Sequence, residues 1–189
     1  MGWTTMPKPV NVKAFMDDMY SRYMDKTCDY RILKSAIVNR TEYYCAVEKV
    51  SRETGDRVVW AGVAMLNYYP RATDGYTFGY KDMSEEMGPY LWNCPNSILE
   101  LLTSTEHKGA LKWREDCATV AKRKANVAAL KTGDIIRLET PLRFSDGVER
   151  QYFAVLRDGR ALRFISGGVR VMISRFHERN FTLVQKETV

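Results

Sequence analysis

Hydrophobic positions near the start of the chain change from a helical to a strand period. Asn11 can cap a helix whose apolar side chains recur every three or four residues. This helical face comprises Val12, Phe15, Met16, Met19 and Tyr23. Three segments rich in β-branched and aromatic residues follow, at 30–38, 42–51 and 57–69, and they predict a three-stranded antiparallel meander. The third segment is apolar at both odd and even positions, so we expect it to be a central strand that is covered on both faces.

The pattern is harder to interpret in the next segment, FGYKDMSEEMGP, where three carboxylates and two methionines lie between glycines. One interpretation is a short helix over 82–87 that ends at the Gly-Pro pair. This helix would bury Met83 and Met87, which are spaced at i and i+4. It would also place Lys81 and Glu85 at the spacing of an exposed ion pair.

Helical periodicity returns after this segment. We expect a short helix over 96–102 and a longer one over 104–126, whose start is marked by Thr103 and Glu106 at capping-box spacing. Residues 128–133 are typical of a linker.

The remaining segment predicts short strands joined by tight turns. Glycine-containing pairs and triplets mark hairpins at 145–147, 158–159 and 167–168, and a last strand follows an irregular turn. In this register one face forms a core of Phe153, Val155, Leu162, Phe164, Val171 and Ile173. The opposite face carries Tyr152, Ile165, Met172, Arg163 and Arg170. The predicted fold class is therefore α+β: a meander covered by helices in residues 1–130, then a five-stranded SH3-like β-barrel in residues 131–189.

Composition excludes several classes of protein. Apolar residues make up 45% of the 189-residue chain, which argues against disorder. No apolar run has membrane-spanning length, and no secretory signal is visible, so we expect a cytoplasmic protein without a membrane partner. The four cysteines are scattered and the histidines number two, which is poor material for a zinc site. We expect reduced, buried thiols, no metal and no cofactor.

Positive charge is concentrated in the last third of the chain. Residues 131–189 carry 11 basic and 7 acidic side chains, and 11 − 7 gives +4 of the total net charge of +6. Nine of those basic residues are arginines, which bind phosphates bidentately and stack on bases. The candidate nucleic-acid-binding residues are Lys122, Arg123, Lys124, Tyr152, Arg157, Arg160, Arg163, Arg170, Arg175 and Arg179. An ordinary basic surface with interleaved acids fits the same residues equally well.

An enzymatic interpretation rests on the acidic segment. Asp82, Glu85 and Glu86 could supply a general base or ligands for a hard metal, with Tyr76 and Tyr80 lining a pocket. No histidine, cysteine or partner acid lies at a recognisable catalytic spacing. No phosphate-binding loop or nucleophile motif is present either. The enzymatic interpretation is therefore the alternative.

Several sequence blocks resemble a known family. They are Met1-Gly-Trp-Thr4, Phe78-Gly-Tyr-Lys-Asp-Met83, Glu86-Met-Gly-Pro89, the stretch from Cys94-Pro95 to Leu101-Leu-Thr103, and Trp113-Arg-Glu-x-Cys117. The chain resembles, along its whole length, a family of uncharacterised proteins carried by bacterial mobile elements, plasmids and phages. The resemblance implies an accessory role, such as countering host defence or assisting DNA establishment, and assigns no catalytic residue.

These observations predict a non-enzymatic accessory protein of a mobile element or phage. It would act through DNA or RNA, or through a host nucleoprotein complex, and its oligomeric state is left open. An isoelectric point near 9.1 excludes a DNA mimic, because such proteins present an acidic surface. A further alternative is a protein–protein inhibitor of a host defence complex that uses exposed tyrosines as anchors. Those tyrosines are Tyr68, Tyr69, Tyr76 and Tyr90.

Overall fold

The chain divides into two compact units. A computed structural model describes residues 2–6, 11–22, 25–69, 78–159 and 161–185. The units are Met1–Ala121 and Lys122–Val189, and each is described by itself. The predicted boundary after residue 130 lies nine residues beyond this division.

The first unit contains β1 (Thr4–Met6), α1 (Val12–Ser21), β2 (Cys28–Val38), β3 (Glu42–Ser51), β4 (Arg57–Tyr68), β5 (Phe78–Ser84), the 3₁₀ turn η1 (Glu85–Met87) and α2 (Asn96–Leu99). Helix α3 spans Lys108–Ala129, and the division between the units falls inside it. The second unit continues with β6 (Ile135–Arg143), β7 (Glu149–Asp158), β8 (Ala161–Ser166), β9 (Val169–Val171), the 3₁₀ turn η2 (Phe176–Glu178) and β10 (Phe181–Gln185).

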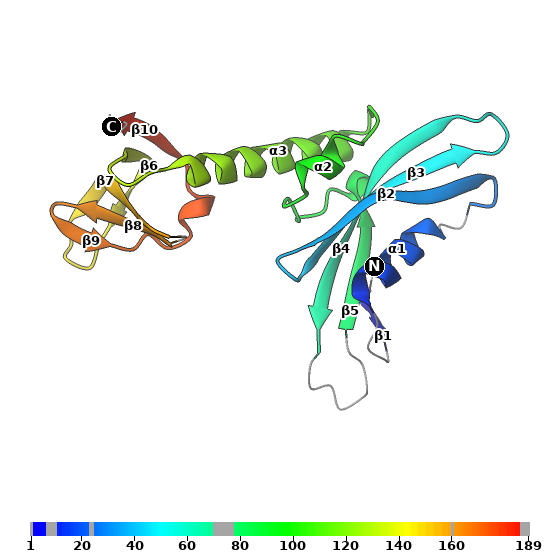
Figure 1. The fold of residues 1–189 in the computed structure, drawn as a ribbon, viewed down its shortest axis with the longest axis horizontal. Helices are drawn as coiled ribbons and strands as arrows, with labels where there is room; N and C mark the ends of the chain where they lie inside the picture. The colour runs from blue at the N-terminus through cyan, green and yellow to red at the C-terminus, as the bar shows by residue number, and fades with distance from the viewer. Residues whose placement is uncertain (1, 7–10, 23–24, 70–77, 160, 186–189) are drawn as a thin grey trace. The chain divides into compact units, whose positions relative to one another are not determined.

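The first unit is built on an antiparallel sheet of five strands in the order β1-β5-β4-β3-β2 (Figure 1). Strand β4 is central, as its apolar residues at both parities predict. On one face, Met16 and Tyr20 of α1 lie in a core cluster with Tyr43 and Phe78. On the other face, Trp113 of α3 lies in a second cluster.

Helix α1 is positioned by a tyrosine that lies against a glycine. Its start is as predicted, because the Asn11 side chain accepts a hydrogen bond from the Ala14 N–H at 3.1 Å. The Tyr20 hydroxyl lies 2.8 Å from the Val63 carbonyl oxygen. A Cβ at Gly62 would lie 2.7 Å from the Tyr20 ring, so this approach requires glycine. Tyr23, predicted on the same helical face, lies outside the described residues.

The acidic segment is a strand where a helix was predicted, and that prediction is wrong. Strand β5 pairs with β4 from Phe78, opposite Tyr68, to Ser84, opposite Gly62. Only the single turn η1 remains helical, and Gly88 ends it in the left-handed region with φ 59°. Met87, expected in the core, is 51% exposed.

The start of α3 also differs from prediction, because Thr103 binds the sheet instead of capping a helix. The Thr103 N–H donates to the Val59 carbonyl oxygen at 3.0 Å. The helix begins four residues later than expected, at Lys108, where the Ala110 N–H donates to His107 Nδ1 at 3.4 Å. At the other end, residues 128 and 129 continue the helix where a linker was predicted.

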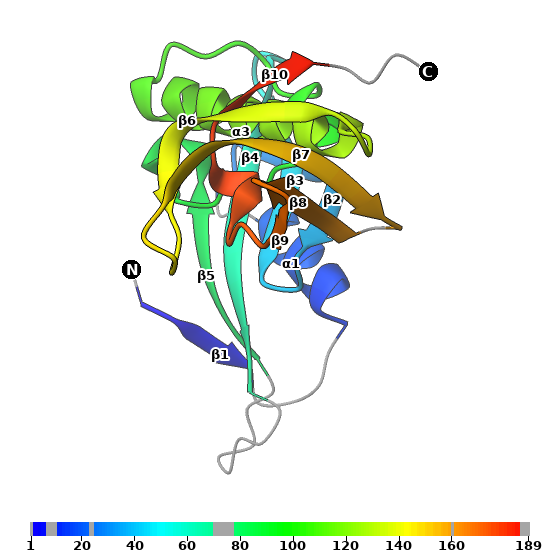
Figure 2. The same ribbon diagram turned by 90° about the vertical axis from the view of Figure 1, so that its left-hand side faces the viewer.

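The second unit is an open antiparallel sheet in the order β10-β6-β7-β8-β9 (Figure 2). The predicted SH3-like barrel is wrong, because the edge strands β9 and β10 do not pair within the described residues. The ring of Phe176, from η2, fills the core beside these strands, 4.6 Å from the Phe164 ring and 5.1 Å from the Phe181 ring. The fold is thus β-rich with two antiparallel sheets, and the predicted fold class of a helix-covered meander followed by a barrel does not hold.

The predicted core face of this sheet is nevertheless found inside. Phe153, Val155, Phe164 and Ile173 are buried, and Leu162 and Val171 pack against them. Between β7 and β8 the register differs from expectation by two residues. Val155 pairs with Phe164, because the turn lies one residue later than the predicted Asp158-Gly159. A shift of two leaves every side chain on the same face.

Candidate nucleic-acid interface

The outer face of the second sheet carries three arginines and an exposed tyrosine. Arg137 of β6 lies directly opposite Tyr152 of β7, and its guanidinium carbon is 5.9 Å from the centre of the Tyr152 ring. Arg163 of β8 faces Leu156 of β7, and Arg170 of β9 faces Ile165 of β8. These positions alternate with the buried core positions, so all of them point away from the core. We call Arg137, Tyr152, Arg163 and Arg170 the arginine face.

In the part of the chain that the structure describes, the arginines of this face have no acidic partners. Arg137, Arg163 and Arg170 are exposed, and none forms an ion pair with a carboxylate among the described residues. The Tyr152 side chain is 52% exposed. The face therefore presents guanidinium donors and an aromatic ring to solvent, which is the chemistry that binds phosphates and stacks on bases.

Arg157, a predicted site residue, has a structural position instead. Its Nε donates to the Leu130 carbonyl oxygen at 2.9 Å. Its Nη2 donates to the carbonyl oxygens of Val127 at 3.0 Å and Ala128 at 3.3 Å. Val127 and Ala128 lie in the last turn of α3, and Leu130 follows directly after the helix, so Arg157 caps the helix C-terminus.

Other predicted residues are dispersed over the second unit. Arg175 has a positive φ of 51° and lies 4.0 Å from the Glu178 carboxylate, and Arg179 Nε donates to the Ser174 carbonyl oxygen at 3.3 Å. Arg123 donates to the Asn180 side chain at 3.3 Å. Lys122 and Lys124 are exposed on α3. Arg160 lies outside the described residues.

Arg137 is a member of the arginine face that the predicted set lacks. Its neighbours Ile136 and Leu138 are both buried. The alternation of apolar and polar residues at 135–139 was the signal that could have placed Arg137 outward.

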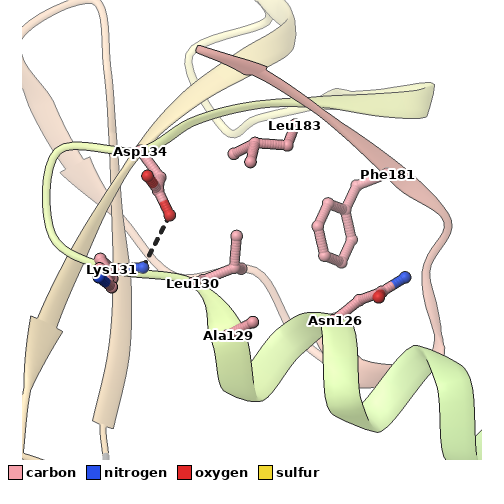
Figure 3. A pocket seen from close by; sticks show the side chains of 7 residues that line it. All are labelled: Asn126, Ala129, Leu130, Lys131, Asp134, Phe181 and Leu183. Atoms are coloured by element: carbon pink, nitrogen blue, oxygen red, sulfur yellow. Dashed lines mark hydrogen bonds between the residues drawn. The ribbon is translucent and has the colours of Figure 1, made fainter. Parts of the chain in front are cut away.

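A separate hollow of about 350 Å³ lies between the end of α3 and β10, within the second unit (Figure 3). Leu130, Phe181 and Leu183 form its apolar wall. Asp134, only 5% exposed, accepts the Lys131 N–H at 2.8 Å and thereby closes the turn after α3. This bond gives the carboxylate a structural role, and the lining holds no pairing of a nucleophile with a base.

The residues of the enzymatic alternative do not converge. Tyr80 is 8% exposed and packs in the core cluster on the α1 face. Glu85 is 1% exposed and binds Arg114 of α3, on the opposite face of the sheet. Asp82 lies in β5, Glu86 is exposed, and Tyr76 lies outside the described residues.

The thiols are buried and unreactive in character. All four cysteines are free and buried, as predicted. Burial raises the pKa of Cys45 and of Cys117 to about 12, and it raises that of Cys94 as well, so these thiols stay protonated at neutral pH. Within the described residues, no group of three or more His, Cys, Asp or Glu side chains is placed to hold a metal ion.

Two further findings bear on the alternatives. No helix among the described residues combines the length and the apolar character needed to cross a membrane. Of the tyrosines suggested as protein-binding anchors, Tyr90 is 86% and Tyr68 is 39% exposed, Tyr69 is half-buried, and Tyr76 lies outside the described residues.

Comparison with known proteins gives one match. A family model described as a domain of unknown function, DUF6927, matches residues 104–176, which is less than half of the chain. No curated protein and no solved structure matches the chain. The matched range contains every residue of the arginine face and assigns no role to any of them.

Proposed function

We propose that the second unit binds nucleic acid through the arginine face. The observation that carries this proposal is the exposure of three guanidinium groups that have no acidic partner in the described residues, on the same sheet face as an exposed aromatic ring. Exposed arginines elsewhere in the chain pair with neighbouring acids, as Arg22 does with Asp18 at 2.8 Å. The arginines of the face keep their donors directed at solvent.

A single strand fits this face better than a duplex. The Tyr152 ring offers a surface on which an unstacked base can lie, and base–aromatic stacking contributes about 1–3 kcal/mol per base. The guanidinium groups can then bind phosphates on either side of that base. The arginine face lies on a sheet and offers no helix to enter the major groove of a duplex.

The wider role remains a proposal of the same kind. A nucleic-acid-binding protein that accompanies a bacterial mobile element or phage could assist its establishment or counter host defence, directly or through a nucleoprotein complex. The resemblance to proteins of such elements supports this role.

The experiment measures binding of fluorescently labelled oligonucleotides to the full chain by anisotropy, over a series of salt concentrations. We expect binding that weakens steeply with salt, because neutralised phosphates release counterions. Replacing Arg163 and Arg170 together by Ala should weaken binding more than tenfold and reduce the slope of log K against log salt by about one for each lost contact. Tyr152→Ala should selectively weaken single-strand binding.

A charge-matched control distinguishes binding through the arginine face from binding that depends only on net charge. Replacing Lys13 and Arg22 by Ala also removes two positive charges, from exposed positions on α1 and just after it. This variant should bind like the unchanged protein. Equal losses in both double variants, or binding that ignores salt, would show that the arginine face is not the interface.

A further inference from the structure

A second group of exposed guanidinium groups lies in the first unit, around the buried carboxylate of Glu48. Glu48 is 2% exposed and lies on β3, directly opposite Arg31 of β2. Arg31 Nε donates to Glu48 Oε2, and Arg57 Nε of β4 forms an ion pair with Oε1. One carboxylate thus holds two arginines from the strands on either side of it.

Both arginines use only one edge of their guanidinium groups. Within the described residues, the Nη atoms of Arg31 and Arg57 make no hydrogen bond to protein. The two side chains remain 70% and 58% exposed. They line a shallow hollow of about 400 Å³ together with Asp29, Tyr30 and Val50.

Neutralising Glu48 does not require two arginines. Glu85, the other buried glutamate with an arginine partner, is satisfied by Arg114 alone and the Ala61 N–H. The second arginine beside Glu48 therefore leaves a net charge of about +1 at the surface. Asp29, which lines the same hollow, does not cancel this charge, because two nitrogens of Arg52 already bind it at 2.9 and 2.5 Å.

We propose that Arg31 and Arg57 form a phosphate-binding site, with Glu48 as the residue that positions them. Because their Nε atoms contact the two oxygens of one carboxylate, the guanidinium groups are held close together in spite of their like charge. A phosphate group offers more oxygens and more negative charge than a carboxylate, so it can bind the free edges of both guanidinium groups at once. This site belongs to the first unit and is independent of the arginine face.

The test titrates the full chain with inorganic phosphate and with pyrophosphate, in a phosphate-free buffer, by calorimetry. The variants Arg31→Gln and Arg57→Gln each leave one arginine to neutralise Glu48. Each should weaken phosphate binding about tenfold or more, because a charge-assisted hydrogen-bond donor pair is lost. The control Arg22→Gln removes an exposed positive charge of the first unit that does not line the hollow and should leave binding nearly unchanged.

Two further variants keep the result interpretable. Arg31→Lys and Arg57→Lys preserve the ion pair with Glu48 but not the planar group, so binding should weaken while the melting temperature stays the same. Glu48→Gln makes the site more positive. It should nevertheless weaken phosphate binding if the carboxylate positions the arginines, and stronger binding would overturn that role.

The choice of titrant identifies the source of the phosphate. If Arg31→Gln weakens binding of pyrophosphate and of an oligonucleotide alike, the site takes a nucleic-acid phosphate. If only pyrophosphate binding falls, the site takes a small phosphorylated molecule. The Arg163/Arg170 double variant should retain pyrophosphate binding in both cases, so failure of the proposed function would be seen separately. Absence of millimolar phosphate binding, or acetate binding as tightly as phosphate, would overturn the proposal.

Discussion

Two buried glutamates of the first unit are neutralised by arginine in different ways. Glu85 binds Arg114, whose three nitrogens are all hydrogen-bonded: Nε and Nη2 to the carboxylate at 2.6 and 2.7 Å, and Nη1 to the Thr103 carbonyl oxygen at 2.7 Å. The Arg114 side chain is only 21% exposed. Around Glu48, the two arginines contact the carboxylate through Nε alone and stay largely exposed. The first arrangement can only stabilise the fold, whereas the second leaves donors for a ligand.

The second unit shows the same contrast. Arg157 donates to three carbonyl oxygens at the end of α3, and Arg163 makes no ion pair within the described residues. Both residues are arginines of one strand pair, but Arg157 shares the core parity of Phe153 and Val155, whereas Arg163 lies on the outer face. The number of donors left unbonded separates a structural arginine from a candidate for binding.

The largest expected effect comes from Arg114→Ala. This change leaves the Glu85 carboxylate buried without its cation, which should lower the free energy of unfolding by about 3–5 kcal/mol. Chemical denaturation measures it. Lys112→Ala, on the same helix, removes an exposed side chain paired with Asp116 and should have no measurable effect. The sequence-based interpretation, an exposed pair of Lys81 with Glu85, would make Arg114→Ala as harmless as the control.

A smaller effect is expected from Arg157→Ala. Loss of the hydrogen bonds from a charged group to the end of α3 should lower the free energy of unfolding by about 1–3 kcal/mol. Arg163→Ala should change it by less than about 0.5 kcal/mol. Oligonucleotide binding should follow the opposite order, with the larger loss in Arg163→Ala. If Arg157→Ala weakened binding and left stability intact, the structural role of Arg157 would be refuted.

The parts of the fold that could be predicted from the sequence depend on local pattern. Strands β2, β3 and β4 and the hairpin at Gly167-Gly168 follow from strand periodicity and adjacent turn residues. Strand β5 could not be predicted, because only Phe78 and Tyr80 favour a strand, whereas its Gly, Lys and Asp residues have low strand propensity. Its conformation is fixed by pairing with β4. The open edge of the second sheet depends on where Phe176 packs, which no local pattern reveals.

The candidate sites show the same limit. The sequence identifies which residues are arginines and, from alternation, which face Arg163 and Arg170 occupy. It does not reveal that Arg157 meets carbonyls 27 to 30 residues earlier. It also does not show that Arg31 and Arg57 converge on Glu48, because the convergence requires three strands in register.

The smallest expected effect concerns Glu48 and tests whether its two arginines act separately. The hydrogen bond from Arg31, followed by the charge of Arg31 and of Arg57, holds the pKa of Glu48 below its usual value of 4.5. A carboxyl whose pKa is lower in the folded state stabilises the fold above its unfolded pKa. That contribution is lost as the pH falls through the folded pKa, so stability should decline below about pH 4.5.

In Arg31→Gln the pKa of Glu48 should rise toward 4.5, and the decline of stability in acid should become shallower. At neutral pH this variant should lose less than about 1 kcal/mol, because Arg57 still neutralises the carboxylate and Arg31 is exposed. NMR titration of the Glu48 side chain and denaturation at several pH values measure both quantities. A neutral-pH loss as large as that of Arg114→Ala would mean that Arg31 is needed for the fold, and the contrast between the two glutamates would fail.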